Sequence, residues 1–197
     1  MQAAFFAVGA LDMNKLGFRL IAASLAATAS VGPLAPPVRA ATAAELNANG
    51  QGALQRLYAE STKASRFGQS AHAILVFPKI VKAGFLIGGQ GGEGVLFVRG
   101  SPTGYYKISA VSYGLQAGGQ SFSYALFIMN EKALDYLGKS NGWAIGSGPS
   151  VVVVDKGKAM STTSTTLKED VYAFPFGQKG LMAGLGLEGS KITRIDK

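Results

Sequence analysis

The fold of this chain is decided by the stretch Ala73-Ile-Leu-Val-Phe-Pro-Lys-Ile-Val-Lys-Ala-Gly-Phe-Leu-Ile-Gly-Gly-Gln-Gly-Gly-Glu-Gly94. In it, short runs of β-branched and aromatic residues are separated by closely spaced glycines, which is typical of strands joined by tight turns. Two later segments have the same mixture, Tyr113-Gly-Leu-Gln-Ala-Gly-Gly-Gln-Ser-Phe122 and Phe176-Gly-Gln-Lys-Gly-Leu-Met-Ala-Gly184. We therefore expect a β-rich domain around this stretch.

The composition agrees with a packed domain, because 48% of the residues are hydrophobic and only 15% are charged. The 27 glycines have no collagen-like period and indicate turns and bulges of a mainly antiparallel sheet. We expect a single α+β domain with a twisted sheet, either a sandwich or a partly closed barrel. Pro78 is expected to end the first strand, since proline cannot donate to a ladder. Strands are predicted at 74–77, 83–88, 94–99, 105–116, 122–129, 151–155, 171–174, 181–187 and 191–195.

Helix signals precede the strands. Thr42-Ala-Ala-Glu45 fits a capping box, so a helix is expected to start there. Gly50 and Gly52 are expected to interrupt the helical region into two pieces. A further short helix is predicted near residues 131–138. Apolar residues at steps of three and four predict the face that packs on the domain: Leu54, Leu57, Tyr58, Ala64 and Phe67.

The first 40 residues are interpreted as a secretory signal peptide. Lys15 and Arg19 precede an apolar run of ordinary signal-peptide length, and small residues surround Ala40. The run is too short to span a bilayer as a helix. We expect cleavage after Ala40, with Ala41-Thr42-Ala43 as an alternative site. This leaves a mature domain of residues 41–197, and Met13 is an alternative start to Met1. The protein is thus expected to be exported, periplasmic or secreted, and associated with membranes only peripherally.

The mature region is basic and has no cysteine. The chain has 19 Lys and Arg against 11 Asp and Glu; residues 1–40 contain three of the former and one of the latter, which leaves 16 against 10, a formal charge of +6. Without cysteine, neither a disulfide nor thiol-linked lipid can anchor the domain. An anionic membrane surface or an acidic polymer fits this charge, and export argues against nucleic acid.

No motif points to catalysis, a cofactor or a metal. Both matches to Gly-x-Gly-x-x-Gly, at 89–94 and 184–189, are followed by strand-like runs, whereas a dinucleotide site needs a helix there. His72 is the only histidine and is expected at a helix-to-strand junction. The hydroxyl run 161–166 is interpreted as a loop or strand edge. Trp143 fits the core better than a membrane interface.

Five ordered blocks resemble the SYLF domain from about Leu57 to the C-terminus. They are the three glycine-rich segments quoted above, Gly142-Trp143 and Gly189-Ser-Lys-Ile-Thr-Arg194. The resemblance implies a module that binds phosphoinositides and other acidic phospholipids, or actin filaments as in yeast members. It implies no enzymatic activity and no cofactor.

Basic residues beside apolar ones suggest where a membrane could bind. The N-terminal helical region is implicated in lipid binding in eukaryotic SYLF relatives, and basic side chains flanked by Leu, Tyr and Phe suit a peripheral contact. A solvated helix face over a strand core explains the pattern equally well. The alternatives are a protein-binding or structural role in the cell envelope, and an unrecognised hydrolase. The predicted lipid-binding residues are Arg56, Lys63, Arg66, Lys79 and Lys82.

Overall fold

The computed structural model describes residues 40–85, 87–113, 118–139, 142–154, 168–180, 187 and 189–197. All of them belong to one compact unit, Arg39–Lys197. Residues 1–39, which carry nearly all of the expected signal peptide, lie outside the described part, so the signal peptide stays a prediction.

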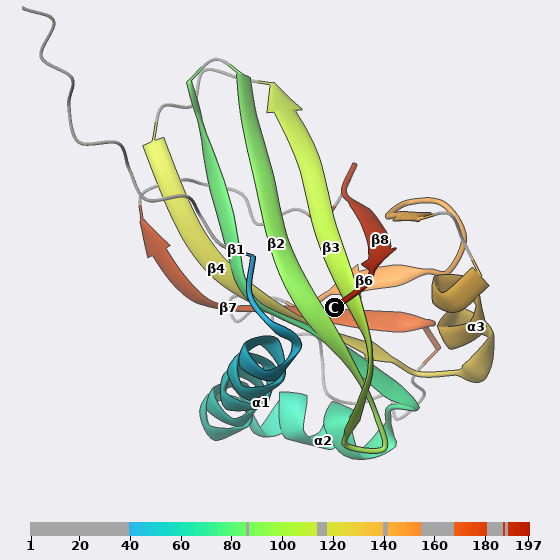
Figure 1. The fold of residues 1–197 in the computed structure, drawn as a ribbon. Coiled ribbons are helices and arrows are strands. Elements are labelled where there is room, and N and C mark those ends of the chain that lie inside the picture. The colour runs from blue at the N-terminus through green and yellow to red at the C-terminus, as the bar shows by residue number, and fades with distance from the viewer. Residues whose placement is uncertain are drawn as a thin grey trace, which may run out of the picture. The chain divides into compact units, whose positions relative to one another are not determined.

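Eight strands of the described residues form one sheet, in the order β5-β8-β3-β2-β1-β4-β7-β6. Every neighbouring pair is antiparallel except β6 with β7. The sheet is curled, and its long strands extend well past the two N-terminal helices (Figure 1). The expected α+β domain with a mainly antiparallel, partly closed sheet is therefore confirmed. The strands are β1 (Ala73–Phe85), β2 (Ile87–Val98), β3 (Ser101–Tyr113), β4 (Gly118–Ile128), β5 (Trp143–Ala144), β6 (Val151–Val153), β7 (Val171–Gly180) and β8 (Lys191–Ile195).

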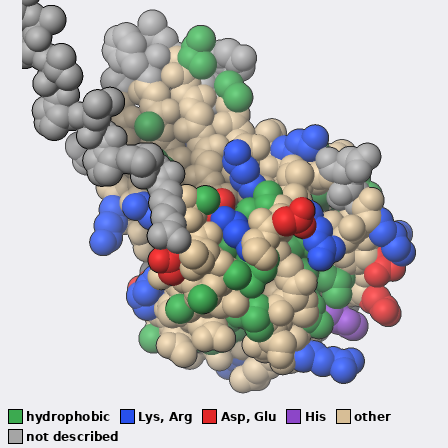
Figure 2. Space-filling view, in the orientation of Figure 1, with side chains coloured by type: hydrophobic (Ala, Val, Ile, Leu, Met, Phe, Trp, Pro, Cys, Tyr) green, Lys and Arg blue, Asp and Glu red, His purple; other side chains and the backbone are tan. Residues whose placement is uncertain are grey.

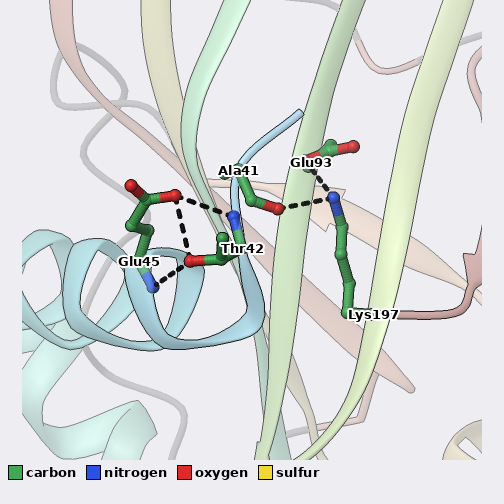
Figure 3. Close-up of polar contacts among 5 residues, drawn as sticks. All are labelled: Ala41, Thr42, Glu45, Glu93 and Lys197. Carbon is green, nitrogen blue, oxygen red and sulfur yellow. Dashed lines mark hydrogen bonds and ion pairs between the residues drawn. The ribbon is translucent and has the colours of Figure 1, made fainter. Parts of the chain in front are cut away.

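Helix α1 (Ala43–Glu60) begins at the predicted capping box. The Thr42 hydroxyl accepts from the Glu45 N–H at 3.2 Å, and the Glu45 carboxylate accepts from the Thr42 N–H at 2.8 Å (Figure 3). The expected interruption at Gly50 and Gly52 is wrong, since α1 runs through both. Gly50 is buried, and a Cβ there would overlap Val95. This glycine allows the helix to approach the sheet closely and does not break it.

The helical region does divide, but at Ser61. This residue ends α1 and caps α2 (Thr62–Ser70), where its hydroxyl accepts from the Ala64 N–H at 3.1 Å. Serine is among the residues that best satisfy the free amides of a helix start. The break therefore has a local cause that lies nine residues beyond Gly52.

Strand β1 continues through Pro78, which corrects the prediction that proline ends it. The pairing register shifts at this point towards both β2 and β4, which marks a β-bulge. The missing N–H of proline costs nothing at a bulge, and the Pro78 carbonyl accepts from the Ser123 hydroxyl at 2.8 Å. β1 and β2 thus form one long hairpin, in which the predicted strand 83–88 spans the turn.

The remaining predictions differ mainly in length. β8 matches the predicted strand 191–195, and α3 (Glu131–Lys139) matches the predicted short helix. β7 continues six residues beyond the predicted end, to Gly180. The predicted strand 181–187 and the hydroxyl run 161–166 lie outside the described residues, apart from Leu187.

Each face of the sheet carries its own apolar cluster. On the helix-bearing face, α1 and α2 pack on Val76, Val95 and their neighbours. The ring of Phe67 in α2 lies 4.5 Å from Tyr172 and 5.3 Å from Phe174, measured between centroids. Because a strand alternates its side chains, the residues between these positions pack on the opposite, inner face.

The inner face lies inside the curl, because its cluster joins residues from both halves of the sheet, such as Ala173 of β7 and Ile192 of β8. Leu137 of α3 packs there as well. Trp143 belongs to the same cluster and is 1% exposed, so the prediction of a core tryptophan is confirmed. Its indole N–H donates to the Ser147 carbonyl at 3.0 Å.

Candidate functional site

The predicted lipid-binding residues lie on two helices and one strand. Arg56 is exposed on α1. On α2, Lys63 is half-buried and Arg66 is exposed, and residues three apart lie on the same side of a helix. Phe67 anchors this helix on the sheet, so the two cations flank its buried side. The helices therefore hold three cations on the outside of the helix-bearing face.

Lys79 and Lys82 both lie within β1, so the expected break between separate strands at 74–77 and 83–88 is wrong. They are three residues apart in a strand and point to opposite faces. Lys79 is exposed on the helix-bearing face, whereas Lys82 is half-buried on the inner face, in register with Gln90 and Gln120. Lys79 thus shares a face with α1 and α2, and Lys82 is separated from the other four.

A cation missed at the sequence level lies close to Lys79. Glu93 of β2 pairs in register with Lys79 on one side and with Lys107 of β3 on the other. Lys107 is exposed, and neither lysine forms an ion pair with any described residue. Lys107 falls in a predicted strand, but only the pairing of β2 with β3 places it beside Lys79.

Glu93 is held by another cation. The Lys197 ammonium lies 2.8 Å from a Glu93 carboxylate oxygen and 2.8 Å from the Ala41 carbonyl (Figure 3). The Lys197 side chain is only 9% exposed, so this pair is better shielded than an ordinary surface ion pair. It offsets the one acidic charge between Lys79 and Lys107, and leaves this part of the face positive.

A groove of about 280 Å³ lies where α1 and α2 meet the turn between β2 and β3. Its walls include Leu54, Tyr58 and Phe97, and His72 and Arg99 also line it. Burial raises the pKa of the Tyr58 hydroxyl. Arg99 has a φ of 50°, the one positive φ among the described non-glycine residues, and forms the turn with Gly100. The groove can hold an apolar group beside a positive charge.

The first glycine motif and His72 lie at positions where each has a structural explanation. Gly89 to Gly94 lies inside β2, so no helix follows the first Gly-x-Gly-x-x-Gly motif. Of its glycines, Gly94 lies opposite the bulge of β1, whereas Gly89 and Gly91 pair in regular register within the strand. His72 lies between α2 and β1, as expected. The described residues contain no group of three or more possible metal ligands, and none of their helices is long and apolar enough to cross a membrane.

Asp170 forms the most connected polar cluster described. Its carboxylate accepts from the Ser150 N–H at 2.9 Å and from the Asn130 side-chain amide at 2.7 Å. These hydrogen bonds lower the pKa of the carboxyl group. Asn130 in turn accepts from the Ala133 N–H at the start of α3. The cluster joins the start of α3 to the end of β4 and the start of β7, so we assign it a role in stabilising the fold.

Comparison with known proteins finds one matching family model and one similar curated protein. Residues 109–197 match the family model described as Ysc84, Las17-binding protein actin regulator. This match confirms the resemblance to the SYLF family over residues 109–197. SH3 domain-containing YSC84-like protein 1 of Bos taurus is 25% identical over 123 residues, which cover 59% of this chain and 36% of the relative. The match therefore spans about a third of that relative's length.

The SYLF match begins within β3 and includes the strands β4 to β8 and helix α3. Of the cations described above, only Lys197 lies inside it. Arg56, Lys63, Arg66, Lys79 and Lys107 precede residue 109. The match to the family model consequently says nothing of these cations.

Proposed function

We propose that this chain is an exported, non-enzymatic module that binds the surface of membranes containing anionic phospholipid. The observation that carries the proposal is a group of cations on one side of the domain, Arg56, Lys63, Arg66, Lys79 and Lys107, all exposed or half-buried. Each cation near an anionic surface contributes about 1 kcal/mol, so several must act together. The acidic Glu93 among them is paired with Lys197.

The proposal includes removal of residues 1–40. The remaining residues 41–197 have a formal charge of +6, from 16 basic and 10 acidic residues. In the periplasm or outside the cell, this charge meets membrane surfaces and acidic polymers. Mass spectrometry of the exported protein should find a chain that begins near Ala41 and carries no lipid. A functional species that retains Met1 or Met13 would contradict export.

Flotation with liposomes tests the binding directly. Residues 41–197 should float with mixed phosphatidylserine–phosphatidylcholine vesicles at low salt and much less with pure phosphatidylcholine. High salt should weaken the binding, because surface electrostatics decay within about 10 Å at 0.1 M. Equal binding to both vesicles, insensitive to salt, would argue against attraction by charge.

Charge reversal tests the location. Changing Lys63, Arg66 and Lys79 together to glutamate lowers the net charge by six units. A control that changes Lys132, Lys139 and Lys168 to glutamate has the same net charge and alters distant positions. The first variant should lose flotation and the control should keep most of it, while both keep the circular dichroism of the parent. Equal loss of flotation in both variants would mean that the net charge of the domain, and not a local group of cations, attracts it to the vesicles.

A second candidate is binding of a partner protein. It is favoured by the description of the matched family as a Las17-binding actin regulator and by the name of the bovine relative. A bacterial-type export signal would separate the chain from cytosolic actin, so this candidate comes second. Cosedimentation of residues 41–197 with actin filaments tests it. An envelope protein or a polyanionic glycan could meet the same basic surface.

A further inference from the structure

The long strands extend beyond the part of the sheet that the helices cover (Figure 1). We call residues 81–85, 87–91, 109–113, 118–121 and 179–180 the sheet extension. Directly paired residues share a face, so the register gives the layout of side chains. On the helix-bearing face, one row across six strands runs Lys191, Ser109, Gly91, Val81, Ser121 and Lys179.

The next rows outward become apolar. Val111, Gly89, Ala83 and Gly119 form the second row, and Ile87 lies in the third. Val81 is 46% exposed, Ile87 62% and Val111 65%. They are three of the five large hydrophobic side chains exposed among the described residues, and they share one face. Figure 2 shows hydrophobic side chains standing out at this end of the molecule.

Cations border this apolar area on the side nearer the helices. Lys179 and Lys191 are exposed at the two ends of the first row. Lys79 and Lys107 lie one row closer to the helices on the same face. The sheet extension contains no acidic residue. Exposed apolar side chains gathered on one face favour an interaction site, and the lysines along their border favour an anionic partner surface.

The order of the rows matches a membrane interface. Paired rows on one face are two residues apart, or about 7 Å, because a strand rises about 3.3 Å per residue. The outermost side chains thus lie roughly 7 to 14 Å beyond the lysine row. Peripheral elements bury their apolar face about 5–10 Å into the boundary between headgroups and acyl chains. Long lysine side chains at that level reach phosphates while their stems cover apolar surface.

We propose that the sheet extension is an insertion edge: Val81, Ile87 and Val111 enter the interfacial layer of an anionic phospholipid membrane, and Lys79, Lys107, Lys179 and Lys191 contact lipid phosphates. This inference rests on the proposed membrane binding and adds to the cations of α1 and α2 an inserting element built from the strands. The glycines and serines between these residues carry little or no side chain, so they add no bulk where the ends of the strands enter the headgroup layer.

Site-specific fluorescence tests the insertion. The chain has no cysteine, so Ile87→Cys or Val111→Cys takes an environment-sensitive thiol dye at one position. Val153→Cys on β6 is the control, because Val153 is also exposed, at 40%. With mixed phosphatidylserine–phosphatidylcholine vesicles, dye at Ile87 or Val111 should shift to the blue and be quenched by acyl-chain quenchers. Dye at Val153 should respond to neither.

Binding variants test the energetics. Ile87→Ser with Val111→Ser should weaken vesicle binding about tenfold, as expected for loss of aliphatic burial, while Val153→Ser leaves it unchanged. Lys179→Gln with Lys191→Gln should weaken it about fivefold per lysine at low salt, and Lys132→Gln with Lys139→Gln should not. Melting temperatures close to the parent's exclude unfolding as the cause.

The outcomes separate the two proposals. Flotation of the unlabelled chain with an unresponsive dye at both Ile87 and Val111 would overturn the insertion edge and leave membrane binding intact. No flotation of the unlabelled chain would overturn both. A blue shift that appears without vesicles and grows with protein concentration would identify the edge as a contact between copies of this chain, which also overturns the inference.

Discussion

The covered base of the sheet and the sheet extension are built from the same strands but differ in composition and burial. In the base of β1, Leu75, Val76 and Phe77 point alternately to the two faces and all three are fully buried. In the extension of the same strand, Val81 is about half exposed, and its partner across β2 is Gly91. Backbone pairing resumes beyond the bulge at Pro78 and continues through the extension, so pairing alone does not create a core.

In the base, large apolar side chains on both faces of the sheet are buried by the elements that pack on them. The helices cover one face and α3 with Trp143 covers the other. Glycines in the extension bury little area and lose more backbone entropy on ordering than other residues. The extension therefore depends on the base for its stability, and we expect it to open more readily in hydrogen exchange.

The largest effect is expected in the aromatic cluster of the base. Phe127 is fully buried, and its ring centroid lies 5.1 Å from that of Phe174 and 6.2 Å from that of Phe67. Phe127→Ala should lower the free energy of unfolding by about 3–5 kcal/mol, because it leaves a cavity between helix and sheet. Urea denaturation measures this. A loss below about 1 kcal/mol would mean that the base is not the source of stability.

The glycines of β2 should separate into two classes at the boundary. A Cβ on Gly94 would lie 2.5 Å from Phe77 Cδ1 and 2.7 Å from the Val76 carbonyl oxygen. Gly94→Ala should thus cost about 1–3 kcal/mol through overpacking. A Cβ on Gly91 meets only the Ile108 carbonyl oxygen at 3.7 Å, and the φ of Gly91 is not positive.

Gly91→Ala is therefore the matched control within the same strand. It should leave stability unchanged or raise it by about 0.4–1 kcal/mol, since alanine restricts the unfolded chain. Thermal melts of both variants give the comparison. Equal destabilisation by the two substitutions would refute the distinction between the bulge and the extension.

Asp170 should make the base sensitive to acid. Its folded pKa lies below the ordinary carboxyl value, so its contribution to stability is present above that value and is lost as pH falls through the lowered pKa. Asp170→Asn should cost about 1 kcal/mol at neutral pH, since one charged acceptor is lost from a partly buried cluster. Denaturation midpoints should fall below about pH 4 in the parent, and less steeply in the variant.

The smallest effect is expected at the insertion edge. Val111→Thr keeps a β-branched side chain on an exposed strand position, so the free energy of unfolding should change by less than about 0.5 kcal/mol. Chemical denaturation checks this value. A loss comparable to that of Phe127→Ala would show that Val111 is packed in solution, and the edge would then be unavailable to a membrane.

Local chemistry predicted several elements correctly. The capping box at Thr42 and Glu45, the short helix α3 and the strand β8 each depend on residues within one or two turns or one strand. The predictions at Gly50 and Pro78 were wrong because the roles of these two residues depend on distant parts of the chain. Gly50 is explained by Val95, and Pro78 by a bulge stabilised from Ser123, both far away in the chain.

The candidate site was predicted only in part. The cations on α1 and α2 follow from helical spacing, and Lys79 is exposed as expected. Lys82 was grouped with Lys79 because no strand was expected over residues 78–82, and the continuous strand places the two on opposite faces. Lys107, Lys179 and Lys191 had no local signal, because their alignment depends on which strands are neighbours.

The amino-acid sequence by itself determined the fold class, the starts of α1 and α3, the basic charge and the resemblance to the SYLF family, since these depend on composition and short-range patterns. Only the tertiary structure decided which residues share a face. β3 pairs with β8 and β4 with β7 across many intervening residues, and a bulge at Pro78 shifts the alternation of β1. A shift of one residue moves every later side chain to the other face, so the surface of this protein is set by register.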